Sequence, residues 1–241
     1  MTLLAIASLH GSPGASTLAA ALGHEMNRCG RATLLVEADP DGGVLAARYD
    51  LPLSPSLTDL AGAARRTVES GEVAKYAQRL GDRLPVVVAH PSAEQTSSAL
   101  RASAESLAQT FAGAEFGVIA DVGRWRADSP SLPFVDASPT VLVVARPTLE
   151  DVVRLVSLAA VGNLRKRVQV VLVGERPYDA SQVTEATALP VLASLPVLRS
   201  LGRAGQRDTR GRQRRIWQRR IVSLAASLGA RPDEEMGLPA H

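Results

Sequence analysis

The sequence has few aromatic residues, a single cysteine and no long hydrophobic run, and each of these absences excludes a class of protein. Aromatic residues make up 3% of the 241 residues, so a core must be built mainly from Ala, Val and Leu. Cys29 is the only cysteine, which excludes an internal disulfide and a cysteine metal cluster. No run approaches the roughly 18 apolar residues of a membrane-spanning helix. Residues 1–8 lack the positive flank and apolar length of a signal peptide, so we expect a cytoplasmic protein.

Lysine is almost absent from the chain. Lys75 and Lys166 are the only lysines, and the other 25 of the 27 basic residues are arginine. Eight of these arginines lie in residues 203–220 with Asp208 as the only acidic residue, which gives this segment a net charge of +7. Since the whole chain carries +3, the remaining residues sum to −4. The basic character is therefore local, and it indicates one basic surface rather than a uniformly basic protein.

Short apolar runs alternate with longer amphipathic segments along the chain. Several runs are continuous in Val, Ile and Leu, which is typical of parallel strands covered on both faces. The predicted strands are Leu3–Ser8, Ala32–Glu37, Leu84–His90, Phe116–Asp121, Thr140–Ala145, Val168–Val173 and Val191–Leu195. The predicted helices are Ser16–Arg28, Ser92–Phe111, Leu149–Val161, Ala180–Ala188 and Thr209–Leu228.

This order predicts an α/β fold, a doubly wound and mostly parallel sheet flanked by helices. The sequence contains no internal repeat and no low-complexity linker. We therefore expect one domain over residues 1–230, which includes the basic helix at 209–228, followed by a polar tail at 231–241.

The segment from Leu9 to Thr17 follows the first predicted strand and opens the first predicted helix, which is the place of a phosphate-binding loop. In an open α/β sheet, ligands bind outside the carboxyl ends of the strands. Glycines such as Gly11 and Gly14 let backbone N–H groups converge on phosphate oxygens, and the helix N-terminus adds partial positive charge. In such loops a lysine reaches the β- and γ-phosphates, and the next hydroxyl binds Mg²⁺.

This loop resembles that of the MinD/ParA family of deviant Walker A ATPases, Lys-Gly-Gly-x-Gly-Lys-[Ser/Thr]-Thr. His10 stands in place of the signature lysine of the family, and Ala15 stands in place of the P-loop lysine. The family pattern is matched at Gly11, Gly14, Ser16 and Thr17. The resemblance places a nucleotide against His10, Gly11, Ser12, Pro13, Gly14, Ala15, Ser16 and Thr17.

Other segments resemble the same family in the same order, over residues 1–200. The segment 36–43 is similar to the switch Asp-x-Asp-Pro-Gln-Gly, with Asp39 as its second aspartate and Glu37 in place of the first. The run 116–121 resembles the Walker B strand and ends at Asp121. The strand at 168–173 is followed by Gly174, where the family has an asparagine that reads adenine. The resemblance implies catalytic roles for Asp39 and Asp121, and Mg²⁺ ligation by Ser16, Asp39 and Asp121.

The resemblance implies a factor that positions or partitions cellular components, acting as a homodimer or with a protein partner. The loss of both lysines favours impaired or absent ATP hydrolysis, since removing one such cation costs about 3 kcal/mol of transition-state stabilisation. Weak binding of ATP or ADP with Mg²⁺ is compatible with the retained residues, and so is the absence of any nucleotide. The alternative is a slow but functional ATP-dependent dimerising switch.

The predicted helix at 209–228 combines an apolar stripe with many arginines. One interpretation is a solvated helix packed on the sheet, and the other is a surface for phosphates. ParA-like relatives bind DNA without reading its sequence, whereas MinD-like relatives place a terminal amphipathic helix on anionic lipid. Because Gly229 and acidic residues at 233–235 follow the helix, we favour a DNA-binding accessory role over a membrane surface. The basic residues of this surface are Arg210, Arg212, Arg214, Arg215, Arg219 and Arg220.

Overall fold

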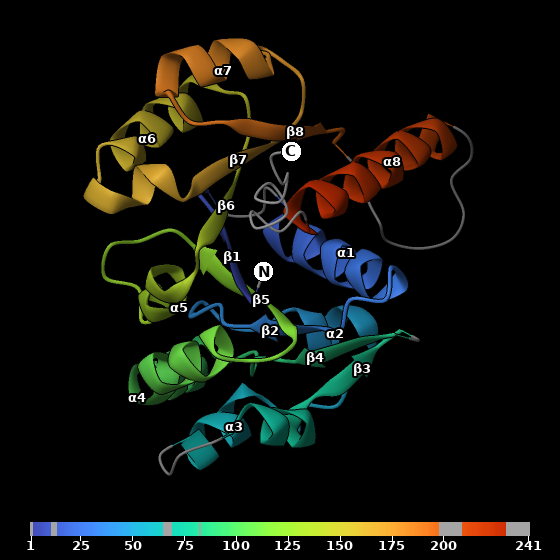
Figure 1. Cartoon of the computed structure of the whole chain (residues 1–241), viewed down its shortest axis with the longest axis vertical. Coiled ribbons are helices and arrows are strands. Elements are labelled where there is room, and N and C mark those ends of the chain that lie inside the picture. Colours follow the sequence, from blue (N-terminus) through green and yellow to red (C-terminus); the bar gives the residue numbers. More distant parts are fainter. Residues whose placement is uncertain (1, 11–13, 65–68, 82, 198–208, 230–241) are drawn as a thin grey trace, which may run out of the picture.

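The computed structural model describes residues 2–10, 14–64, 69–81, 83–197 and 209–229. Within these residues, eight strands form one sheet in the order β3-β4-β2-β5-β1-β6-β7-β8 (Figure 1). All neighbours are parallel except β3 and β4, which are antiparallel. The strands are β1 (Leu3–Ser8), β2 (Thr33–Glu37), β3 (Gln78–Leu80), β4 (Leu84–Val87), β5 (Gly117–Arg124), β6 (Thr140–Ala145), β7 (Val168–Val173) and β8 (Val191–Leu195).

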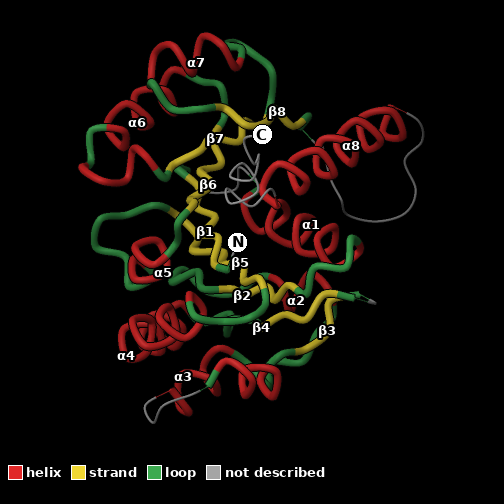
Figure 2. The backbone as a smooth tube through the Cα atoms, viewed as in Figure 1, coloured by secondary structure: helices red, strands yellow, loops and turns green. Residues whose placement is uncertain are grey.

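Helices cover both faces of this sheet (Figure 2). One face carries α1 (Ala15–Arg28), α2 (Leu45–Tyr49) and α8 (Thr209–Gly229). The other face carries α3 (Leu57–Ala64), α4 (Ala93–Ala112), α5 (Leu132–Ala137), α6 (Leu149–Ala159) and α7 (Ala180–Thr187). Two short 3₁₀ helices, η1 (Ser70–Tyr76) and η2 (Gly162–Lys166), complete the described elements. The predicted doubly wound, mostly parallel α/β fold is confirmed.

The sheet separates two hydrophobic cores because successive residues of a strand point to opposite faces. In β1, Leu3, Ala5 and Ala7 belong to one core, whereas Leu4 and Ile6 belong to the other. Every residue of β1 is buried, which explains why its sequence is a continuous apolar run rather than an alternating one.

The predicted and observed strands agree closely, with three main differences. The predicted strand at 84–90 is too long, since β4 ends at Val87. The predicted strand at 116–121 ends too early, since β5 continues to Arg124. Strand β3 was not predicted, because three residues at a sheet edge give no periodic pattern.

Helix α8 packs against α1 and β8, and its apolar stripe is buried at Ile221, Leu224 and Leu228. The sequence also predicts Val222 as part of this stripe, which is wrong, because its side chain is 40% exposed. The side chain of Arg210 and the tail at 231–241 lie outside the described residues. Among the described helices, none has the length and hydropathy needed to cross a membrane.

The strand order places the predicted site at the carboxyl edge of the sheet. Strand β5 lies between β1 and β2, and Asp121 is in register with Ile6 on one side and Glu37 on the other. The segments that follow β1, β2 and β5 therefore start from neighbouring strand ends, as expected for the ligand-binding edge of an open α/β sheet.

Candidate functional site

Helix α1 begins at the carboxyl edge with no side-chain cap. Gly14 occupies the N-cap position in a left-handed conformation with φ 101°, which glycine adopts without strain. Its carbonyl accepts a hydrogen bond of 2.8 Å from the N–H of Leu18. The first turn of α1 contains no acidic residue. Such an uncapped N-terminus suits an anion. Gly11, Ser12 and Pro13 lie outside the described residues, so their predicted role stays a prediction.

Asp121 is a fully buried carboxylate with one unpartnered oxygen. Its Oδ1 accepts an N–H of Gly123 at 3.3 Å, whereas its Oδ2 has no hydrogen-bond partner among the described residues. The pKa of Asp121 is raised to about 7, mainly by burial and also by the charges of Glu37 and Asp39, whereas hydrogen bonding from Ser16 lowers it. The structure thus brings Ser16 and Asp121 together, and their role as Mg²⁺ ligands stays a prediction. Within the described part of the chain, no group of three His, Cys, Asp or Glu side chains is arranged to hold a metal ion.

Asp39 lies close to the end of β5. Burial raises the pKa of its carboxyl, and the arginines Arg124 and Arg126 lower it. Its Oδ1 accepts the N–H of Asp41 at 2.9 Å. A Cβ at Gly123 would lie 2.2 Å from this same oxygen, and Gly123 has φ +69°, so a larger residue there would be strained and would displace the carboxylate of Asp39. This role of Gly123 was not predicted from the sequence.

Glu37 has a structural role instead of the ligand-facing role of the aspartate that it replaces. Its Oε1 accepts the N–H groups of Val44 at 2.7 Å and Leu45 at 2.9 Å, and its Oε2 accepts the N–H of Ala89 at 2.9 Å. The side chain is buried, and burial raises its pKa, although these three hydrogen bonds oppose the rise. Glu37 therefore fastens the start of α2 and the segment after β4 to the end of β2.

Glu37→Gln is expected to destabilise the protein by about 2 kcal/mol. The amide would place an NH₂ group against at least one backbone N–H that now donates to a carboxylate oxygen. Urea unfolding of both proteins measures the difference. Glu72→Gln is the control, because Glu72 is an exposed carboxylate paired with Lys75 and its loss is expected to change stability little. Equal stability of the two variants would contradict the structural role of Glu37.

His10, at the position of the signature lysine, contacts a carboxylate of its own chain. Its Nδ1 contacts Asp151 Oδ1, and the other oxygen of Asp151 accepts the N–H of Arg146 at 2.6 Å. The side chain of Asp151 is 1% exposed and that of His10 is 39% exposed. His10 is thus directed toward the start of α6. Asp151 was not predicted as a site residue, because its place three residues after Thr148 indicates only a helix start.

Arginines from outside the loop lie near the carboxyl edge. Arg48 of α2 donates from Nη1 to Thr17 Oγ1 at 3.1 Å, so its guanidinium lies beside the first turn of α1. Arg126 forms an ion pair with Asp41 at 2.8 Å. Neither contact was predicted, because no sequence pattern connects Arg48 or Arg126 with these partners.

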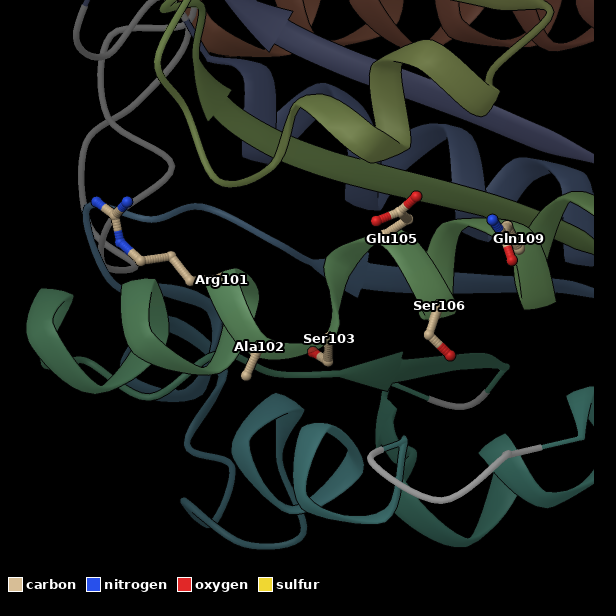
Figure 3. Close-up of a pocket in the computed structure, with 6 residues that line it drawn as sticks. All are labelled: Arg101, Ala102, Ser103, Glu105, Ser106 and Gln109. Atoms are coloured by element: carbon tan, nitrogen blue, oxygen red, sulfur yellow. The ribbon is translucent and has the colours of Figure 1, made fainter.

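A depression on the described surface lies apart from this site. It has a volume of about 410 Å³ and opens on the outer face of α4 (Figure 3). All of its lining residues come from this one helix: Arg101, Ala102, Ser103, Glu105, Ser106 and Gln109. None of them belongs to the predicted site.

Comparisons with known proteins identify the fold. No family model and no curated protein matches the chain. Among solved structures, a ParA family ATPase from Chlorobium tepidum is 15% identical, with a TM-score of 0.68 over 95% of this chain and 93% of that one. The septum site-determining protein MinD from Pyrococcus horikoshii, complexed with Mg-ADP, is 15% identical, with a TM-score of 0.70 over 94% and 95%.

A third solved structure carries a different named activity. It is cobyrinic acid a,c-diamide synthase from Mycobacterium smegmatis, with bound ATP analogue and magnesium. This protein is 21% identical, with a TM-score of 0.64 over 95% of this chain and 94% of that one. At such identities the likeness is one of fold, and one fold serves several functions. The chain has the fold of the MinD/ParA P-loop ATPases.

Proposed function

We propose that this chain is a positioning or scaffold factor that binds a nucleotide with Mg²⁺ and whose ATP hydrolysis is impaired or absent. One observation carries the proposal: neither lysine position of the family holds a free cation. Ala15 has no charge, and His10 contacts the buried Asp151.

Nucleotide binding is supported by the groups that remain. The uncapped start of α1 after Gly14 offers backbone N–H groups to phosphate oxygens. Ser16 lies beside Asp121, whose free buried oxygen suits Mg²⁺ or one of its water ligands. The P. horikoshii MinD and the M. smegmatis synthase bind nucleotide and magnesium, which is consistent with the same ligand class here.

The missing positive charge of the P-loop lysine is the reason that we expect impaired ATP hydrolysis. Phosphoryl transfer depends on cations that stabilise negative charge on the transferred group. Without the P-loop lysine, about 3 kcal/mol of this stabilisation is absent, which corresponds to a rate loss of roughly 100-fold. Burial raises the pKa of Asp121 to about 7, so this group is only partly ionised at neutral pH before a cation binds.

The experiment that tests this function is calorimetric titration of nucleotide-free protein with ATP and ADP in the presence of Mg²⁺, together with phosphate release. Micromolar to sub-millimolar binding with no measurable turnover supports the proposal. Turnover at a rate typical of a working ATPase would favour the dimerising switch instead. No binding at millimolar nucleotide would contradict nucleotide binding and leave only a scaffold.

A second candidate function, a non-specific DNA-binding accessory, is favoured by α8. Four of its apolar side chains, Ile221, Leu224, Ala225 and Leu228, are buried, while the arginines that the structure describes on it are exposed. The exposed basic residues that the structure describes on this helix are Arg212, Arg214, Arg215, Arg219 and Arg220. Such a row neutralises backbone phosphates without reading bases.

Replacing Arg214, Arg215, Arg219 and Arg220 together by glutamine is expected to leave folding intact and to weaken DNA binding at least about tenfold. The salt dependence should also flatten, by about 0.9 in logarithmic slope for each DNA phosphate that the variant no longer neutralises. Fluorescence anisotropy with duplex DNA at several salt concentrations measures both. The control removes the same charge from other surfaces, with glutamine at the exposed Arg101, Arg154, Arg165 and Arg176. Equal decreases in affinity for both variants would contradict a specific role for α8.

A further inference from the structure

We propose that Arg48 of α2 is the phosphate-binding cation of this protein, in place of the lysines that the loop lacks. This inference rests on the proposed binding of a nucleotide. It assigns the missing positive charge to a residue outside the loop, contributed by a different helix. The ligand class that follows is a polyphosphate that carries a divalent cation.

The position of Arg48 supports this assignment. Its Nη1 donates to Thr17 Oγ1 at 3.1 Å, and Thr17 lies in the first turn of α1, three residues after Gly14. The side chain of Arg48 is exposed. A guanidinium has five N–H donors in a planar fork, so donors remain for a phosphate after the bond to Thr17. The described residues of this first turn contain no acid that would compete for the guanidinium.

The local fold holds Arg48 at this place. Glu37 accepts the N–H groups of Val44 and Leu45, which fixes the start of α2 to the end of β2. The N–H of Arg48 donates to the carbonyl of Val44 at 3.0 Å, so Arg48 follows one helical turn later. Leu45 is completely buried in the same core as α1. Two departures from the family pattern are thereby linked, namely Glu37 in place of an aspartate and the loss of the loop lysines. Glu37 anchors α2, and α2 carries Arg48, the proposed replacement cation.

Asp121 indicates which ligand belongs here. Its Oδ2 is buried, has no partner among the described residues, and belongs to a carboxyl group that interacts with Ser16 of the same first turn. Glu37 and Asp39 add negative charge around it. A free anion would be repelled by these carboxylates, whereas a Mg²⁺-polyphosphate would bring a cation toward the unpartnered oxygen of Asp121 and phosphate oxygens toward Arg48.

The test compares Arg48→Gln and Arg48→Lys in the full chain, with Mg-ATP and Mg-pyrophosphate as the probes. Arg48→Gln is expected to raise the dissociation constant for both probes about tenfold, because the variant cannot form one charge-assisted hydrogen bond. Arg48→Lys should retain part of the affinity, since it keeps the charge but not the fork. Both variants should keep the wild-type melting temperature without ligand. Arg101→Gln, on the outer face of α4, is the matched control and should bind like wild type (Figure 3).

A double variant gives an independent result. If Arg48 supplies the charge that a P-loop lysine supplies elsewhere, Arg48→Gln should weaken Mg-ATP binding less in an Ala15→Lys background than in wild type. Unchanged binding of Mg-ATP in Arg48→Gln would overturn the role of Arg48 and leave the proposed function standing. A lowered melting temperature in both Arg48 variants with unchanged affinity would make the contact with Thr17 structural. Absence of binding in wild type and in Ala15→Lys would overturn both proposals.

Discussion

Ala15→Lys is expected to tighten Mg-ATP binding by about 10- to 150-fold, the range given by a new hydrogen bond to a charged group of about 1.5–3 kcal/mol. Ala15 is the first residue of α1 and follows the left-handed Gly14, which is the place that the P-loop lysine occupies in the family pattern. A lysine at this position would lie at the start of α1, next to the proposed site of the β- and γ-phosphates. The described backbone at Gly14 and Ala15 therefore suits a phosphate, and what this position lacks is the positive charge of a lysine.

Calorimetry with Mg-ATP, and separately with Mg-ADP, measures the gain. Ala15→Met is the control, because it adds comparable length without charge and tests whether the 7% exposed Ala15 site accepts a longer side chain. A gain with lysine alone supports a phosphate site at this helix N-terminus. Equal affinities for wild type, lysine and methionine variants would contradict that site. Hydrolysis should recover only in part, because His10 remains in contact with Asp151.

The sheet could be predicted from sequence because its central strands are continuous apolar runs. The strands β1, β6, β7 and β8 begin and end as predicted, since each is bounded by polar or turn-forming residues. The short helices α2, α3 and α5 were not predicted. Five to eight residues contain too few apolar positions to establish a helical period, and tertiary packing decides their conformation.

The site was predictable only where it follows from strand order. Glu37 ends β2 and Asp121 lies in the last half of the neighbouring strand β5, so a doubly wound sheet places them side by side, and the structure pairs them in register. The contacts of His10 with Asp151 and of Arg48 with Thr17 join segments that no sequence pattern connects. The role of Glu37 was also beyond prediction, because a buried carboxylate that accepts backbone N–H groups has the same sequence signature as one that faces a ligand.

Asp121→Asn is expected to make the protein more stable above neutral pH. Burial raises the pKa of Asp121 to about 7, well above its ordinary value of 3.8, so the folded state holds this proton more tightly than the unfolded state. The contribution of this bound proton to the free energy of unfolding is complete below about pH 4 and is lost as the pH rises through about 7. The wild type therefore loses up to about 4 kcal/mol through this one group over that range. The pKa values of Glu37 and Asp39 are also raised, which adds a loss of the same sign.

Asparagine keeps the shape of the side chain but does not ionise. Urea unfolding at pH 5 and pH 8 should show a variant that gains about 2–4 kcal/mol over wild type at pH 8 and much less at pH 5. Asp136→Asn, at an exposed carboxylate on α5, should follow the wild-type curve at both values. Parallel pH dependences for wild type and Asp121→Asn would show that Asp121 does not titrate near neutrality.

The same variant separates stability from ligand binding. A buried carboxylate that destabilises the folded protein at neutral pH is expected where a bound cation restores its favourable environment. Mg-ATP should therefore raise the melting temperature of wild type at pH 8, and it should raise that of Asp121→Asn less, although the variant is the more stable protein without ligand. If Mg-ATP stabilises both proteins equally, Asp121 does not contact the metal, and its burial has a structural cause.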